Sequence, residues 1–306
     1  MARGMNKPMF SYCLRYLVTS NSVLLFLFLI HPIELRSQWQ WQQLPTSQRL
    51  ADVYFADTSN GWIVGLDGIF HTSDGSNTWE VQGSRGDHIS GLDKNECWVI
   101  VADSLIHTTD GGNVWNRSPI GNFGLDSISF LTQVSFLDRS NGWVSVFGWK
   151  NGQSETRILA TKDGGTTWSD HSIYSTGFYN LAGNALICFI DSTLGWVTAD
   201  YSFVYKTVDG GITWDSLSQG AYAATYSMKF MTRELGYLST DGPVITTSVD
   251  KTLDGGSNWQ SVLVLDCSGR TYFDFADSSN GWVVTSTCWH SAEIHHTPDG
   301  GLHWDL

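Results

Sequence analysis

The chain is poor in positive charge. Only 17 of its 306 residues are Lys or Arg, against 30 Asp or Glu, which gives a formal net charge of −13. Nucleic-acid binding depends on clustered cations that neutralise phosphates, and an anionic membrane surface attracts basic segments in the same way. The composition therefore argues against both kinds of partner, and we expect no nucleic acid to bind.

A hydrophobic run long enough to span a membrane is also missing. The apolar run near the N-terminus, Val23–Ile30, has eight residues, whereas a transmembrane helix needs about 20. Basic residues precede this run and the small residue Ser37 follows it, which is typical of a cleaved signal peptide. We expect residues 1–37 to be a signal peptide and 38–306 to be a single exported domain that is secreted, periplasmic or at the cell surface, with no membrane insertion after cleavage. A single-pass anchor is the alternative.

Cysteine is scarce, with five residues in the chain. Cys13 lies in the expected signal peptide, and Cys97 and Cys188 lie in apolar, strand-like runs, which favours buried free thiols. Cys267 and Cys288 flank one predicted hairpin, so a disulfide between them in an oxidising compartment and two free thiols are both open. No cysteine spacing suits a metal site, and we expect neither a metal nor a cofactor.

The abundant feature is a phrase that occurs six times: a hydroxyl residue, any residue, Asp, Gly, usually a second Gly, two more residues and Trp. Its Asp residues stand at 74, 110, 163, 209, 254 and 299, so the steps are 36, 53, 46, 45 and 45 residues. A period near 45 with one tight turn per unit predicts a repeat array or a propeller. The hydroxyl, Asp and Trp positions are Thr72, Asp74, Trp79, Thr108, Asp110, Trp115, Thr161, Asp163, Trp168, Thr207, Asp209, Trp214, Thr252, Asp254, Trp259, Thr297, Asp299 and Trp304.

A second phrase, Phe-x-Asp followed by Gly-Trp, alternates with the first. Its clear copies are 55–62, 136–143, 189–196 and 275–282, and its degenerate copies are 91–98 and 230–237. In each unit a strand ends at Phe-x-Asp, a second strand begins with Gly-Trp, a third enters the Asp phrase and a fourth follows its Trp. Four short antiparallel strands with Gly-rich turns are typical of one propeller blade. The sequence therefore predicts an all-β propeller with six four-stranded blades, and seven blades are the alternative.

The residues of the Asp phrase suit a self-supporting turn. Gly adopts the positive φ angles that tight turns require, and Asp and Thr side chains hydrogen-bond to loop amides. The Trp supplies a large apolar plate between sheets. A Ca²⁺ loop is the competing interpretation, but each copy offers one carboxylate where the ion takes six to eight oxygens. We expect a structural role.

How the ring closes is left open by the sequence. Trp39–Leu44 resembles the strand that follows a phrase Trp, although no Asp phrase precedes it. The last unit reaches Leu306 just as its own fourth strand would begin. We expect six blades with the N-terminal strand completing the sixth. The alternative is a truncated copy of a longer protein with further blades.

The Asp phrase resembles the Asp box, or BNR repeat, of sialidases, sortilin-type receptors and some β-glucanases. Its alternation with Phe-x-Asp and Gly-Trp more closely resembles the propeller family of photosystem II assembly and stability factors and its exported bacterial relatives. The resemblance covers about Leu50 to Leu306. It implies that the Asp box is a fold element away from the active face, and that the protein has an assembly-factor-like or cell-surface interaction role.

Strand alternation places both repeated phrases on one face of the propeller, and the other face then carries the loops that do not repeat. Variable loops on a rigid scaffold are where binding tends to reside. The alternative is that these are ordinary solvated loops. The third unit has 25 residues between its two Trp, against 17 in the first two, so its hairpin should protrude. The candidate binding residues for a protein or glycan partner are Arg85, Asp87, His88, Trp149, Lys150, Tyr179, Tyr222, Arg270, Trp289 and His290.

Signs of catalysis are few. The sequence lacks the Arg-Ile-Pro signature of sialidases, and a glycosidase needs two facing carboxylates. Asp52, Asp87, Asp200 and Asp274 lie outside the motifs, but their spacing does not pair them. We predict no catalytic residues and an exported, non-catalytic propeller that acts as a binding or assembly scaffold. A secreted Asp-box glycoside hydrolase, sialidase-like or glucanase-like, is the alternative.

Overall fold

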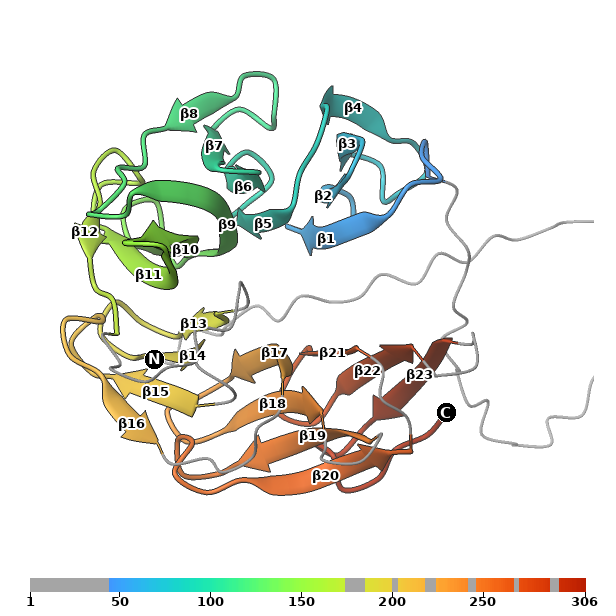
Figure 1. The fold of residues 1–306 in the computed structure, drawn as a ribbon. Helices are drawn as coiled ribbons and strands as arrows, with labels where there is room; N and C mark the ends of the chain where they lie inside the picture. The colour runs from blue at the N-terminus through green and yellow to red at the C-terminus, as the bar shows by residue number, and fades with distance from the viewer. Residues whose placement is uncertain are drawn as a thin grey trace, which may run out of the picture.

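The computed structural model describes residues 44–173, 185–199, 203–217, 224–241, 246–266, 270–286 and 292–306. These residues form six antiparallel β-sheets around a ring (Figure 1), which confirms the predicted six-bladed all-β propeller. Within the described ranges, no helix has the length and apolar character needed to cross a bilayer. The predicted signal peptide 1–37, the pair Cys267 and Cys288, and all of Trp39–Leu44 except Leu44 lie outside these ranges.

The first three blades have four strands each. Blade 1 contains β1 (Leu50–Phe55), β2 (Gly61–Gly65), β3 (Gly68–Thr72) and β4 (Glu80–Gly83). Blade 2 contains β5 (His88–Gly91), β6 (Cys97–Val101), β7 (Ser104–Thr108) and β8 (Asn116–Ser118). Blade 3 contains β9 (Ser127–Phe136), β10 (Gly142–Lys150), β11 (Gln153–Thr161) and β12 (Ser169–Asp170).

Blades 4 and 5 repeat this pattern, and blade 6 shows three strands among the described residues. Blade 4 contains β13 (Ile187–Phe189), β14 (Gly195–Ala199), β15 (Phe203–Thr207) and β16 (Asp215–Leu217). Blade 5 contains β17 (Thr225–Phe230), β18 (Gly236–Asp241), β19 (Thr247–Thr252) and β20 (Gln260–Leu265). Blade 6 contains β21 (Thr271–Phe275), β22 (Gly281–Ser286) and β23 (Ala292–Thr297). A bridge from His296 to Asp305 begins its fourth strand.

Each sheet pairs its strands in chain order, so the first strand is innermost and the fourth is outermost. The inner strands β1, β5, β9, β13, β17 and β21 surround the centre of the ring, as Figure 1 shows. The second strands β2 and β6 are buried over almost their whole length. β6 reads as a continuous apolar run because blades 1 and 3 cover its two faces.

The Phe and Gly of the second phrase are adjacent across the first two strands. Phe136 pairs with Gly142, and a Cβ on that glycine would lie 2.5 Å from the Phe136 ring. The same pairing joins Phe55 to Gly61, and Phe189 to Gly195. Glycine is required here because the ring of the first strand crosses the backbone of the second.

The hydrophobic core lies between the blades. Five clusters of buried residues occur in the described part of the chain, one between each pair of consecutive blades from 1–2 to 5–6. In four of them a Phe lies flat on the second-strand aromatic residue of the preceding blade, with ring centroids 3.6–3.8 Å apart. These pairs are Trp98–Phe136, Trp143–Phe189, Trp196–Phe230 and Tyr237–Phe275.

Blade 2 departs from this rule in two linked positions. Gly91 stands where the other blades have Phe, and its strand partner is Cys97, where the others have Gly. Without a ring to cross the strand, the second position tolerates a side chain. A Cβ at Gly91 would lie 2.1 Å from Tyr54, so the Tyr54 ring of blade 1 fills the space that Phe takes elsewhere.

The two described cysteines, Cys97 and Cys188, are free thiols, as the sequence predicts. Burial raises the pKa of both thiols above its ordinary value. The Cys188 sulfur accepts a hydrogen bond from the Phe230 amide of the next blade. Both residues therefore serve packing, since a reactive cysteine needs a lowered pKa and access to solvent.

Candidate functional site

One face of the propeller is formed by both repeated phrases, and we call it the Asp-box face. In every blade the first box glycine donates a backbone hydrogen bond of 2.7–3.0 Å to the turn of the second phrase. The six bonds are Gly75–Ser59, Gly111–Asn95, Gly164–Ser140, Gly210–Thr193, Gly255–Glu234 and Gly300–Ser279. The opposite face, which we call the variable-loop face, carries the β2–β3 type hairpin loops and the links between blades.

The box carboxylate is used inside its own turn. Asp209 accepts hydrogen bonds from the Thr207 hydroxyl at 2.8 Å, the Thr213 amide at 2.9 Å and the Thr213 hydroxyl at 2.6 Å. The bonds from Thr213 lower the pKa of Asp209 to about 2. The Gly211 amide in turn donates to Thr207 at 2.8 Å. A carboxylate with this many donors acts as a structural acceptor within the loop.

The boxes also tie neighbouring blades together. The Trp98 indole donates to the Gly164 carbonyl of the next box at 3.2 Å, and Trp196 donates to Gly255 at 2.9 Å. Trp143 and Tyr237 make the same contact with the boxes that follow them. The repeated Asp phrase is therefore both a turn and the acceptor for the preceding blade.

The first box contains an unusual residue. Ser76 has φ 73° where the other five boxes have Gly with φ between 85° and 99°. Positive φ is unfavourable for a residue with a Cβ. The Ser76 amide still donates to the Thr72 hydroxyl at 2.9 Å, so the turn keeps its hydrogen bonds at the expense of backbone strain.

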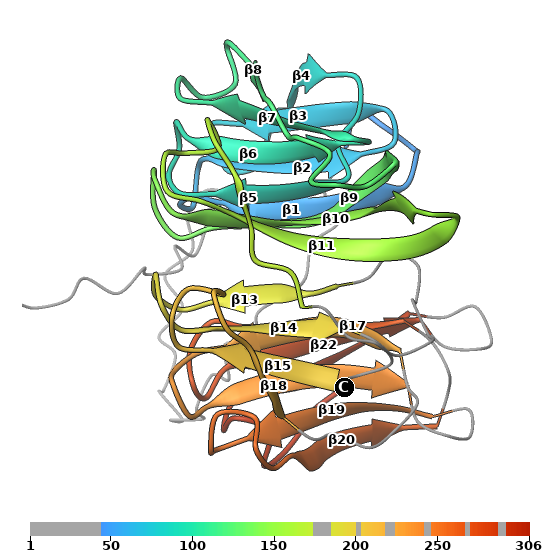
Figure 2. The same ribbon diagram turned by 60° about the vertical axis from the view of Figure 1, so that its left-hand side comes forward.

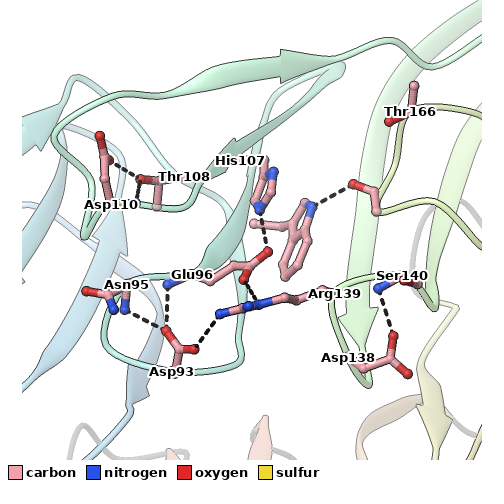
Figure 3. Close-up of polar contacts among 12 residues, drawn as sticks. Asp93, Asn95, Glu96, His107, Thr108, Asp110, Asp138, Arg139, Ser140 and Thr166 are labelled. Atoms are coloured by element: carbon pink, nitrogen blue, oxygen red, sulfur yellow. Dashed lines mark hydrogen bonds and ion pairs between the residues drawn. The ribbon is translucent and has the colours of Figure 1, made fainter.

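A polar cluster of Asp93, Glu96, His107 and Arg139 lies on the Asp-box face between blades 2 and 3. Figure 3 shows Arg139 reaching across to both carboxylates. Arg139 Nε lies 2.6 Å from Glu96 Oε2, and its Nη2 lies 3.5 Å from Asp93 Oδ2. The other Glu96 oxygen is 3.1 Å from His107 Nε2. The cluster joins the second-phrase turns of two blades.

The burial of Glu96 within this cluster indicates a structural role. Glu96 is buried, and its two carboxylate oxygens contact Arg139 and His107. The His107 ring lies on Trp98 with a centroid distance of 4.2 Å. Burial lowers the pKa of His107 in spite of the opposing effect of Glu96. Both Glu96 oxygens are therefore used within the protein, and the sequence alone did not predict the cluster.

Three of the candidate binding residues form a compact group at the link between blades 1 and 2. Arg85 Nη2 lies 2.8 Å from Asp87 Oδ1, and Asp87 Oδ2 accepts from the Ala102 amide at 2.9 Å. His88 Nδ1 lies 3.5 Å from an oxygen of Asp52. Asp87 and Asp52 therefore hold the segment between blades 1 and 2 in place, and this uses part of the hydrogen-bonding capacity of their carboxylates.

The other candidate catalytic carboxylates from the sequence, Asp52 and Asp274, also make contacts within the protein. Asp52 Oδ2 accepts from the Ile89 amide at 3.1 Å, and Asp274 pairs with Lys229 and with the Phe275 amide. Asp200 lies outside the described residues. Each described member of this set makes its own structural contact rather than facing a second carboxylate.

Blade 3 carries the most prominent feature of the variable-loop face. β10 and β11 have nine residues each, and their hairpin extends beyond the neighbouring strands (Figure 2). Phe130, Phe147 and Trp149 share one side of this sheet, with ring centroids 5.0 Å and 6.3 Å apart along the row. Trp149 is 44% exposed and Phe130 is 38% exposed, whereas Phe147 between them is buried and supports both rings. We call these three residues the aromatic platform.

The tip of this hairpin is held by the link that precedes blade 3. The Asp126 amide donates to the Trp149 carbonyl at 2.7 Å, and Asp126 Oδ2 accepts from the Asn151 amide at 2.6 Å. Lys150 lies next to Trp149 in the same strand and is partly exposed. The platform is therefore presented by a supported strand pair.

Sequence reasoning selected Trp149 and Lys150 but not Phe130 and Phe147. The alternation of Phe147 with Trp149 in an unusually long strand was the available signal. Arg270 is exposed just before β21. Tyr179, Tyr222, Trp289 and His290 lie outside the described residues. Among the described candidates, the structure joins Arg85 to Asp87, pairs His88 with Asp52, and places Trp149 and Lys150 on a different blade.

Comparison with known proteins extends this description. A sequence profile of the family described as photosynthesis system II assembly factor YCF48 matches residues 31–125. Among curated protein sequences, none matches the chain. The structure of YCF48 bound to a D1 peptide superposes with a TM-score of 0.62 at 21% identity, over 86% of this chain and 83% of that one.

Other propellers share the fold at lower identity. The GH74 xyloglucanase from Xanthomonas campestris gives a TM-score of 0.64 at 13% identity, over 88% of this chain and 46% of that one. The extracellular domain of the hybrid two-component system BT4673 from B. thetaiotaomicron gives 0.57 at 8% identity, over 80% and 32%. This chain is thus a six-bladed Asp-box β-propeller that resembles the YCF48 assembly-factor family.

Proposed function

We propose that this protein is an exported, non-catalytic scaffold that binds a segment of a partner protein on its variable-loop face. The match of residues 31–125 to the YCF48 family supports an assembly-type role. The similar propeller YCF48 has been solved with a D1 peptide bound, which supports a polypeptide as the ligand class. Export rests on the signal-like sequence of residues 1–37.

The aromatic platform is the observation that carries the proposal. Large aromatic side chains dominate the binding energy of protein interfaces because they bury much apolar area with little loss of entropy. Trp149 is 44% exposed on a hairpin tip that Asp126 fixes from two sides. A preorganised surface of this kind loses little free energy on binding. Lys150 adds a positive charge beside the platform for an acidic or carbonyl-rich segment.

The platform can be tested with a photo-crosslinking amino acid in place of Trp149. A matched control carries it in place of Val81, which is exposed on the outer strand β4. We expect a discrete protein adduct from position 149 and none from position 81. A peptide from the crosslinked region should then bind the wild-type protein at least roughly tenfold more tightly than Trp149→Ala, with Val81→Ala unchanged.

Two outcomes would contradict the proposal. Equal peptide binding to the wild type and to Trp149→Ala would place the site elsewhere. Binding to a glycan array that is lost in Trp149→Ala, without a protein adduct, would make the ligand a sugar instead.

The hydrolase alternative is separately testable. The xyloglucanase is the enzyme with the same fold, but this chain covers 46% of its length, and the described off-motif carboxylates Asp52, Asp87 and Asp274 make structural contacts. We expect no hydrolysis of xyloglucan, other plant glucans or sialosides by the purified protein. Hydrolysis that disappears in an Asp→Ala variant at one of these positions would show an enzyme.

A further inference from the structure

Asparagine followed directly by glycine occurs at four places in the chain, 60–61, 141–142, 151–152 and 280–281. This dipeptide is chemically reactive, because the glycine amide nitrogen can attack the asparagine side chain and glycine has no Cβ to hinder the approach. The reaction needs an asparagine side chain that is free to turn and a glycine nitrogen that it can reach. The four copies differ in both respects.

Three copies belong to the second phrase and are held in place. In each, the asparagine Nδ2 donates to both oxygens of the Asp three residues earlier, at 2.8–3.1 Å. The asparagine carbonyl also accepts a backbone bond across the turn, as Asn141 does from the Leu137 amide at 3.0 Å. The glycine that follows is buried and lies in a strand that is paired on both sides. These copies are Asn60–Gly61, Asn141–Gly142 and Asn280–Gly281.

The fourth copy lies at the tip of the blade 3 hairpin. Asn151 and Gly152 form the two-residue turn between β10 and β11, where Lys150 pairs with Gln153. Both turn residues are exposed, with φ 52° and 75°. The Asn151 backbone amide donates to Asp126. Within the described structure, neither the Asn151 side chain nor the Gly152 amide has a hydrogen-bond partner.

We propose that Asn151 is a site of spontaneous modification by deamidation. The Gly152 nitrogen bonds to Asn151 Cγ, the bond from Cγ to Nδ2 breaks, and Nδ2 leaves as ammonia together with the Gly152 amide proton. Water then opens the cyclic imide at either of its two carbonyl carbons. Opening at Cγ gives aspartate, and opening at the main-chain carbonyl gives isoaspartate, whose backbone runs through the former side chain. Both products carry a carboxylate that asparagine lacks.

The modification changes the strand pair that presents the aromatic platform. An aspartate at position 151 adds a negative charge next to Lys150, on a residue whose amide is bonded to the Asp126 carboxylate. Isoaspartate also adds a backbone carbon inside a two-residue turn, and such a turn requires positive φ at both of its positions. The pairing of Lys150 with Gln153 at the tip is then broken. The resulting loss of partner binding rests on the proposed function, whereas the modification itself does not.

Mass spectrometry of the full chain tests the site. The protein is aged in warm, mildly alkaline heavy-oxygen water, so that each converted asparagine takes up a heavy oxygen atom, and isoaspartate methyltransferase then labels the isoaspartate. We expect Asn151 to convert at least roughly tenfold faster than the other three, because those react only after local opening of a blade. In the urea-unfolded chain all four should convert at similar rates. Asn151→Gly is the matched variant, since Gly-Gly forms the same turn, and its hairpin peptide should not convert.

Hydrogen exchange measures the consequence for the hairpin. In the isoaspartate form, the amides of β10 and β11 near the tip should exchange faster than in the fresh protein, because their pairing is broken. Asn151→Asp has the added charge without the added backbone carbon and should change the exchange less. Asn151→Gly should match the fresh protein.

Equal conversion of Asn151 and Asn141 in the folded protein would overturn the proposal, as would an Asn151 that stays intact while the unfolded chain converts. Unchanged exchange in the isoaspartate form would overturn its effect on the hairpin. Faster exchange with undiminished binding of the peptide crosslinked at position 149 would support the modification site and contradict the aromatic platform as the binding surface.

Discussion

The Phe230 ring of blade 5 lies on the Trp196 indole of blade 4 with a centroid distance of 3.6 Å and an interplanar angle of 1°. Lys206 Nζ lies 5.4 Å from the same indole centroid. The indole N–H is used by the Gly255 carbonyl. One tryptophan thus makes an aromatic contact, a cation contact and a hydrogen bond across or beside a single blade junction.

Removal of this ring should destabilise the protein strongly. Phe230→Ala deletes a buried side chain, and we expect the free energy of unfolding to fall by about 3–5 kcal/mol in urea titrations. Phe55→Ala is the matched control, because the same motif position is 43% exposed in blade 1. Its loss should be under about 2 kcal/mol. Equal losses at the two positions would mean that Phe55 is as buried as Phe230 in solution.

Ser76→Gly should stabilise the protein. Ser76 holds φ 73°, which glycine adopts without a Cβ clash. The gain is offset in part by the greater freedom of glycine in the unfolded chain, so we expect about 0.5–1 kcal/mol. The reverse change in the second box, Gly112→Ser, should destabilise, because a Cβ there would lie 1.8 Å from Gln82 Oε1. Differential scanning calorimetry of both variants would show whether each melting temperature rises or falls relative to the wild type.

Acid should destabilise the protein through its box carboxylates. The pKa of Asp209 is lowered from its ordinary 3.8 to about 2 by hydrogen bonds from Thr213. A lowered folded-state pKa gives stability that is complete above about pH 4 and is lost as the pH falls toward 2. Urea midpoints measured from pH 7 to pH 2 should show this decline. Asp209→Asn should lower stability by about 1 kcal/mol at pH 7 and make the acid decline shallower; an unchanged pH profile would exclude a contribution from this box.

Arg139→Ala should weaken the junction of blades 2 and 3 in a salt-dependent way. Arg139 is largely exposed, so its pair with the buried Glu96 contributes about 1 kcal/mol or less. We expect the loss to shrink at high salt, where the exposed charge is screened. A double-mutant cycle with Glu96→Gln isolates the pair. A coupling free energy of zero at low salt would show that His107 alone satisfies Glu96.

Much of the fold was predictable because the same turn and strand motifs recur in all six units of the sequence. The Phe and Gly of the second phrase, such as Phe136 and Gly142, are opposite one another in register, and the Asp box closes the third strand onto the fourth. Period and turn chemistry therefore predict the blade and its two faces. The longer hairpin of blade 3 followed from its spacing alone.

The candidate site was less accessible to sequence reasoning. Phe130 joins Phe147 and Trp149 only because β9 and β10 pair in a particular register, which a single sequence does not give. The ion pair between Glu96 and Arg139 joins residues 43 positions apart, and neither residue belongs to a repeated motif position. Contacts that depend on the relative placement of two blades leave no periodic signal.

Gly91 has a consequence for the order in which the protein unfolds. Blades of a repeat array contact only their neighbours, so each is held by its interface terms. Blade 1 lacks the Phe–Trp pair with blade 2 because Gly91 replaces the ring, and on its other side Val53 and Phe55 are exposed. It should therefore open first, and hydrogen exchange should be faster in β2 and β3 than in β10 and β11. Blades 3 to 5, with a ring pair at both sides, then form the cooperative centre from which refolding proceeds.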